Sequence, residues 1–160
     1  MDPLKAGICA GSAALAIGGG IGISLMNREP FAYTLNSSEA VTVAATYTNG
    51  NLGAIQANKT KLVADIEKNK NWFEWIYKNE LEPKKTKDSK ASNELSSEFQ
   101  AVTKGYGKET NDTSIALNKV CDSAYKKSKT DFETEANKIK YKSDVEKFCV
   151  YGSDKSLNLE

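Results

Sequence analysis

The uncharged run between residues 6 and 26 constrains this chain more than any other feature of its sequence. Its 21 residues, AGICAGSAALAIGGGIGISLM, include no acidic or basic side chain. As a helix rising about 1.5 Å per residue, the run would reach roughly 32 Å, which is enough to cross the hydrocarbon core of a bilayer. We therefore expect residues 1–28 to be an N-terminal membrane anchor, with residues 6–26 as the transmembrane helix.

Two other interpretations of this run remain open. The triplets Ala14-Leu15-Ala16 and Gly22-Ile23-Ser24 have the small-x-small pattern of a signal cleavage site, so the run could be a secretory signal. Its six glycines would each cost about 1 kcal/mol in a helix interior, which favours a soluble glycine-rich segment. The length of the run and the residues on either side of it favour the membrane anchor. Because Arg28 is the only basic residue between Asn27 and Lys59, we expect a single-pass protein of the cell membrane whose bulk is extracellular.

Composition argues against several functional classes. The chain has no histidine, the commonest general base and metal ligand. Its 22 basic residues nearly balance its 21 acidic ones, and all the basic residues except Arg28 are lysine. Arginine is the residue favoured for bidentate phosphate and guanine contacts. We expect no enzyme activity, catalytic residue, metal site or cofactor, and neither nucleic acid nor a small-molecule substrate as a partner.

The remainder of the chain predicts a mainly α fold, that is, one small helical domain over residues 52–151. The β-branched and aromatic residues at 30–48 favour a short extended or β segment within a stalk at 29–51. From Leu52 onward the apolar residues recur at helical spacing up to Ile76. The last residues, 152–160, are expected to form a flexible tail.

Helix boundaries are predicted from proline and from capping patterns. Pro83 is expected to end a helix and to open a lysine-rich linker at 83–92. A helix over 112–126 is indicated by an apolar stripe of Leu117, Val120, Cys121 and Ala124. Capping-box patterns that begin at Thr130 and at Ser143 predict two further helices, the first with Phe132, Ala136 and Ile139 facing inward.

The densest aromatic cluster is the segment from Trp72 to Tyr77, which holds both tryptophans of the chain, with Phe73 and Trp75 between its ends. In a domain this poor in apolar residues we expect these side chains to anchor the core. A partner-binding surface or a contact with the membrane interface is the alternative.

Cys121 and Cys149 lie on the apolar faces of two predicted helices and are placed to meet. Outside the cell they would form a disulfide, whereas inside the cell they would be small buried hydrophobic residues. The sequence does not decide between these two states.

Three stretches of the chain resemble a known group of proteins. They are the opening MDPLKAG with the GGG that follows it, the segment NWFEWIYKNE, and the late segment DVEKFCVYG. Together they resemble the large paralogous families of short, uncharacterised proteins of haemotropic mycoplasmas. The resemblance implies a membrane-anchored, surface-exposed protein that contributes to antigenic diversity or host-cell contact, and it implies no catalytic residue.

Two functional hypotheses follow from these features. The first is a surface-displayed, non-enzymatic protein that acts as an antigen or contacts a protein or surface of a host cell. The alternative is an inward-facing, membrane-associated scaffold or complex subunit that binds a protein partner through the Trp72–Tyr77 cluster.

Overall fold

The computed structural model describes residues 28–86, 94–133 and 135–160, and they form a mainly helical domain. Its α-helices are α2 (Val41–Ala44), α3 (Gln56–Lys59), α4 (Lys70–Ile76), α5 (Glu82–Thr86), α7 (Ser97–Gln100), α8 (Leu117–Tyr125) and α9 (Ala136–Phe148). Shorter 3-10 helices are η1 (Ser38–Ala40), η2 (Leu52–Ala54), η3 (Glu67–Asn69), η5 (Thr110–Asp112) and η6 (Lys129–Phe132), and η4 (Tyr77–Leu81) is a π-helix.

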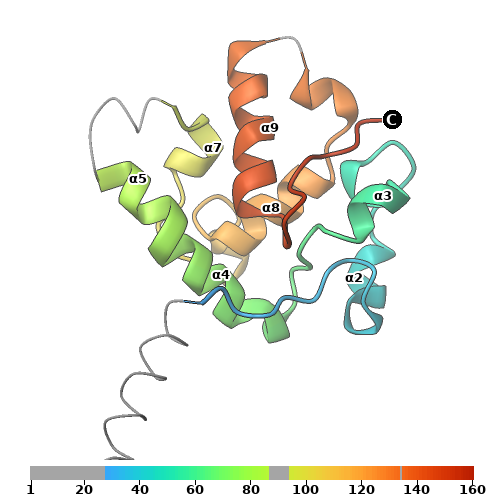
Figure 1. Cartoon of the computed structure of the whole chain (residues 1–160), viewed down its shortest axis with the longest axis horizontal. Helices are drawn as coiled ribbons and strands as arrows, with labels where there is room; N and C mark the ends of the chain where they lie inside the picture. Colours follow the sequence, from blue (N-terminus) through green and yellow to red (C-terminus); the bar gives the residue numbers. More distant parts are fainter. Residues whose placement is uncertain (1–27, 87–93, 134) are drawn as a thin grey trace, which may run out of the picture.

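Helix α8 lies at the centre of the domain, and α9 runs from there to one end of it (Figure 1). The helical segment from α4 to α5 runs along one side, and α2 and α3 lie on the other. The largest fully buried side chains include Trp72, Phe99, Tyr125, Phe132 and Phe148, which come from five separate parts of the chain. The core is therefore built by α4, α7, α8, η6 and α9 together.

No helix among the described residues is both long enough and apolar enough to cross a bilayer. The predicted transmembrane helix at 6–26 lies outside the described residues. So does most of the predicted lysine-rich linker, at 87–92.

The predicted stalk at 29–51 is instead part of the domain. Ala32, Leu35, Ala40 and Tyr47 are all buried in the core. The expected extended segment is limited to an isolated bridge between Thr34 and Val63, and η1 and α2 follow it. Because a stalk would leave these apolar side chains in water, their burial favours folding onto the domain.

The helix expected from Leu52 to Ile76 is interrupted by an extended stretch. Here Leu62, Val63 and Ala64 are three consecutive fully buried residues. The stretch lies between two other chain segments, with bridges from Val63 to Thr34 and from Leu62 to Val150. An extended chain covered on both sides can bury successive residues, which a surface helix cannot do.

Pro83 lies inside α5 and does not end the helix. The main chain continues in helical conformation from α4 through η4 into α5. In the π-helical turn the Glu82 N–H bonds to the Tyr77 carbonyl, five residues earlier. A proline lacks an N–H and crowds the carbonyl four residues before it, and the wider turn accommodates it.

The capping predictions for the last helices are wrong in position. Ser128, and not Thr130, caps η6, and it shares a capping box with Asp131. Helix α9 passes through Ser143 without a break, and Ile139 is exposed although it was expected to face inward. Next to Ser143, buried Asp144 accepts hydrogen bonds from the main-chain N–H and the hydroxyl of Ser96 at 2.7 and 2.8 Å.

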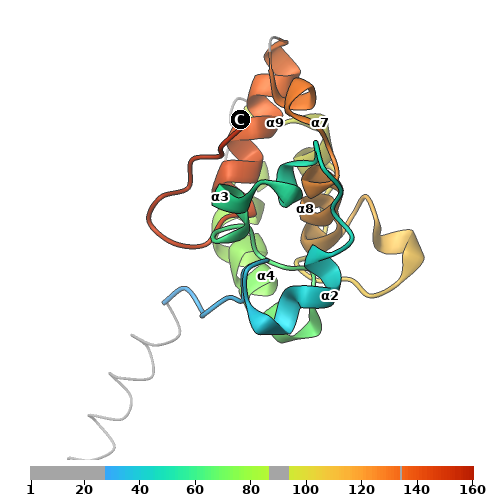
Figure 2. The ribbon, with the colours of Figure 1, turned by 90° about the vertical axis from the view of Figure 1, so that its right-hand side faces the viewer.

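The C-terminal segment, predicted as a flexible tail, packs on α3 (Figure 2). Leu157 is buried, and its N–H donates to Glu146 at 2.9 Å. The fully buried Asn58 side chain donates to the Asn158 carbonyl and accepts from the Asn158 N–H at 2.7 and 2.8 Å. This two-way amide contact fixes the segment, and no local sequence pattern indicates it.

Candidate functional site

The Trp72–Tyr77 cluster divides into a buried half and a half-exposed one. Trp72 and Phe73 are fully buried, with their rings edge to face and 5.0 Å between centroids. The Trp72 indole N–H donates to the Glu29 carboxylate at 2.8 Å, so the first described residues are tied to α4. This half of the cluster is a core anchor.

The other half of the cluster, Trp75 and Tyr77, is partly buried. The indole N–H of Trp75 is buried without a hydrogen-bond partner among the described residues. Burial, followed by the nearby carboxylate of Glu82, raises the pKa of Tyr77. These two side chains are the part of the cluster that a partner could reach.

Cys121 of α8 and Cys149, just after α9, form a disulfide with their Cα atoms 5.6 Å apart. Tyr125 lies next to it, fully buried, with its hydroxyl oxygen 3.0 Å from the Val63 carbonyl and 2.9 Å from the Cys149 carbonyl. Burial raises the pKa of Tyr125 far above its usual range. The disulfide and the hydroxyl together join α8, the end of α9 and the extended stretch at 62–64.

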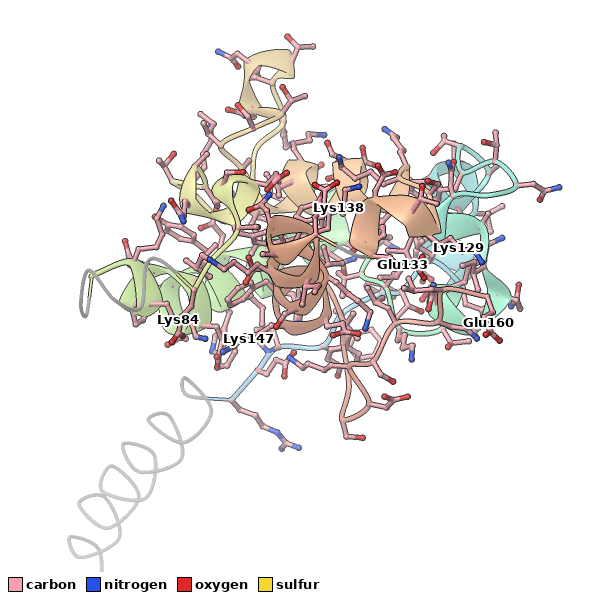
Figure 3. The ribbon with its side chains drawn as sticks, turned by 90° about the horizontal axis from the view of Figure 1, so that it is seen from above. Lys84, Lys129, Glu133, Lys138, Lys147 and Glu160 are labelled. Carbon is pink, nitrogen blue, oxygen red and sulfur yellow. A yellow bond between two sulfur atoms is a disulfide. The ribbon has the colours of Figure 1, made fainter. Side chains whose placement is uncertain are left out.

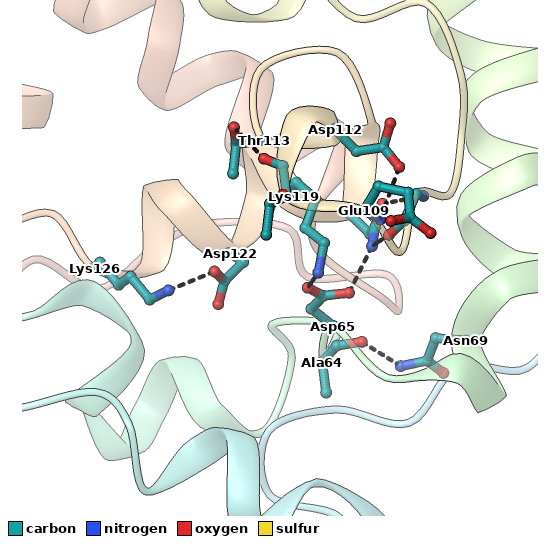
Figure 4. A network of polar contacts seen from close by, with 12 residues as sticks. Ala64, Asp65, Asn69, Glu109, Asp112, Thr113, Lys119, Asp122 and Lys126 are labelled. Atoms are coloured by element: carbon teal, nitrogen blue, oxygen red, sulfur yellow. Dashed lines mark hydrogen bonds and ion pairs between the residues drawn. The ribbon is translucent and has the colours of Figure 1, made fainter.

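A polar network connects that stretch to the start of α8 (Figure 4). The Asp65 carboxylate accepts from the Asn118 amide at 2.6 Å and from the Lys119 ammonium at 2.7 Å. The Asn118 side chain is fully buried and also exchanges two hydrogen bonds with the Gly107 main chain. Both carboxylate oxygens of Asp65 are therefore occupied, and the network is a structural tie.

The loop held by this network also contacts α4 directly. The Tyr106 N–H donates to the Glu74 carboxylate at 3.1 Å. A Cβ atom on Gly105 would lie 2.6 Å from the Phe73 carbonyl oxygen, so only glycine allows this approach. In the same loop, an ion pair and hydrogen bond with Lys104 lower the pKa of Asp112.

A pair of lysines lies between α5 and α9, where Lys84 and Lys147 are close together (Figure 3). Burial and the neighbouring Lys84 ammonium lower the pKa of Lys147 to about 8, against the opposing effect of the Glu80 and Asp144 carboxylates. Lys84 comes from the segment predicted as a lysine-rich linker and Lys147 from the last predicted helix, and their approach depends on the tertiary fold.

The hollows of the domain are shallow. One, of about 500 Å³, lies along the C-terminal segment and is lined by residues that include Lys61, Lys142 and Leu157. A more apolar one, of about 240 Å³, lies between α7, α8 and α9 beside Val120 and Tyr141. Within the described ranges, no group of three or more Cys, Asp or Glu residues gathers closely enough to hold a metal ion.

An aromatic surface at the start of the described chain was missed by the sequence analysis. Phe31 is 66% exposed, and its ring meets those of Tyr33 and Tyr151 edge to face, with centroids 5.1 and 5.9 Å apart. The Lys68 ammonium lies 5.4 Å from the Tyr33 ring centroid. We call Phe31, Tyr33 and Tyr151 the aromatic face. Tyr151 is too far from Phe31 and Tyr33 in sequence for any local pattern to indicate the contact.

Comparison with known protein families, with characterised proteins and with solved structures finds no match for this chain. The resemblance to the mycoplasma families therefore stays a prediction.

Proposed function

We propose that residues 6–26 hold this protein in the cell membrane and that its helical domain is displayed outside the cell. It acts there without catalysis, as an antigen or as a contact for a protein or surface of a host cell. The observation that carries this proposal is the run of 21 uncharged residues directly before a polar, histidine-free domain.

The disulfide between Cys121 and Cys149 supports the extracellular position. Disulfides persist in oxidising compartments, whereas the cytosol keeps most thiols reduced. The near balance of basic and acidic residues and the shallow hollows support a role in contacting a partner surface and not in catalysis.

The inward-facing scaffold remains the second candidate. It is favoured by the partial exposure of Trp75 and Tyr77, which a partner could reach. The burial of Trp72 and Phe73 removes half of the cluster from the surface that such a partner would bind.

Thiol counting separates the two candidates. The full chain is denatured, without reductant, in an excess of a maleimide polymer directly upon lysis of cells that express it. The extracellular proposal predicts that Cys121 and Cys149 react only after reduction, which adds two polymer units. Reaction of both cysteines before reduction would contradict the proposal and favour the scaffold.

A further inference from the structure

The distance between the predicted anchor and the domain is short. Met26 ends the predicted transmembrane helix, and the Glu29 side chain is already hydrogen-bonded to Trp72 in α4. Three residues span at most about 11 Å even when fully extended. If residues 6–26 cross a membrane, as proposed above, the domain has no stalk and must lie directly against the bilayer.

The aromatic face begins only a few residues after that attachment point. Phe31 follows Met26 by five residues, which is at most about 18 Å of extended chain. In Figure 2 the start of the described chain lies on the same side of the domain as the segment after α9 that carries Tyr151. Phe31, the most exposed large apolar side chain among the described residues, therefore lies within five residues of the predicted anchor.

The chemistry of this surface suits a lipid headgroup layer. Aromatic rings, and tyrosine in particular, favour the boundary between water and hydrocarbon because they combine an apolar body with a polar tip. Arg28 and Lys68 are exposed, and the Lys68 ammonium lies over the Tyr33 ring, so both can interact with anionic headgroups. Of the acidic groups in these segments, Glu29 accepts from the Trp72 indole, Glu39 lies 3.8 Å from Lys68, and Asp154 lies 3.2 Å from Lys61.

We infer that the aromatic face of Phe31, Tyr33 and Tyr151 rests on the headgroup layer of the membrane that holds residues 6–26. This contact fixes the orientation of the domain and directs the far end of α9 away from the bilayer. The inference rests on the proposed anchor.

Two matched positions test this orientation. Ser153 is exposed close to Tyr151, and replacing it leaves all three rings in place. Ile139 is 58% exposed in the first turns of α9, and α9 begins at the opposite end of the domain from the start of the described chain (Figure 1). Each is changed to cysteine in a Cys9→Ser background of the full chain and labelled, without reductant, with an environment-sensitive fluorophore.

The labelled chains are reconstituted into vesicles of phosphatidylcholine and phosphatidylglycerol that contain nitroxide-labelled lipid. We expect quenching at residue 153 to exceed quenching at residue 139 several-fold, and Phe31→Ala to reduce it toward the value at 139. Equal quenching at both positions, in chains that float with the vesicles, would overturn the orientation and leave the anchor intact. Chains that do not float with the vesicles would overturn both.

Discussion

At the scale of single residues, the core depends on a few polar side chains that hold separate segments together. Asn58, Asn118, Tyr125 and Asp144 are buried, and each bonds to a part of the chain more than ten residues away. A buried polar group that loses its partner costs more than the bond itself contributes. These residues should therefore be more sensitive to substitution than their small number suggests.

Tyr125 gives the clearest test of this view. Tyr125→Phe leaves the buried Val63 and Cys149 carbonyls without the hydroxyl donor, and we expect it to lower the free energy of unfolding by about 1–3 kcal/mol. Tyr151→Phe is the matched control, because that hydroxyl makes no hydrogen bond with the described residues, and it should change stability by less than about 0.5 kcal/mol. Urea denaturation measures both variants, and equal effects would contradict the assigned role.

The lysine pair predicts how stability depends on pH. The pKa of Lys147 is about 8 in the folded domain, below the ordinary lysine value near 10.4, so folding disfavours its charged form. Below pH 8 the buried charge of Lys147 lowers the free energy of unfolding by its full amount. This loss becomes smaller as the pH rises from 8 toward 10. The free energy of unfolding should therefore increase over that range.

Lys84→Met removes the neighbouring positive charge, so it should raise the free energy of unfolding at pH 7 and flatten the increase above pH 8. Lys78→Met, at an exposed position in η4, controls for the loss of one charge. Denaturation curves at pH 7, 8 and 9.5 give the free energy of unfolding of both variants. Identical pH profiles for the two variants would show that Lys84 does not act on Lys147.

At the scale of helices, the sequence predicted the elements whose pattern is local. The stripe of Leu117, Val120, Cys121 and Ala124 is buried as expected, because α8 packs one face inward over its whole length. The helical spacing from Leu52 to Ile76 was misleading, because 62–64 is buried on both sides by segments distant in sequence.

The break predicted at Pro83 failed for a different reason. The wider π-helical turn before α5 accommodates Pro83, which has no N–H to donate, and single-residue propensities do not predict such a turn. In the same way, the pairing of Asn58 with Asn158 and the aromatic face depend on contacts between residues far apart in the chain.

The disulfide between α8 and the end of α9 closes a loop across 28 positions. Constraining the unfolded chain over such a loop contributes about 3 kcal/mol. We expect the double variant Cys121→Ala, Cys149→Ala to lose about that much stability. Reductant should lower the wild-type protein to the same level and leave the variant unchanged. A variant as stable as the oxidised protein would contradict the stabilising role of the bond.

At the scale of the whole molecule, three features support one arrangement. The uncharged run ends three residues before the chain is fixed to α4, the aromatic face lies beside that point, and the disulfide favours an oxidising compartment. The arrangement that we propose is a domain held close against the outer surface of a membrane, without a stalk.

The central claim is the position of the domain relative to the membrane, and one measurement tests it directly. An epitope tag behind a specific protease site is added after Glu160, which is exposed, and the protease is applied to intact cells that express the full chain. We predict that the tag is released while the rest of the chain stays in the membrane fraction after an alkaline wash. A tag that is protected in intact cells and released only after lysis would contradict the account.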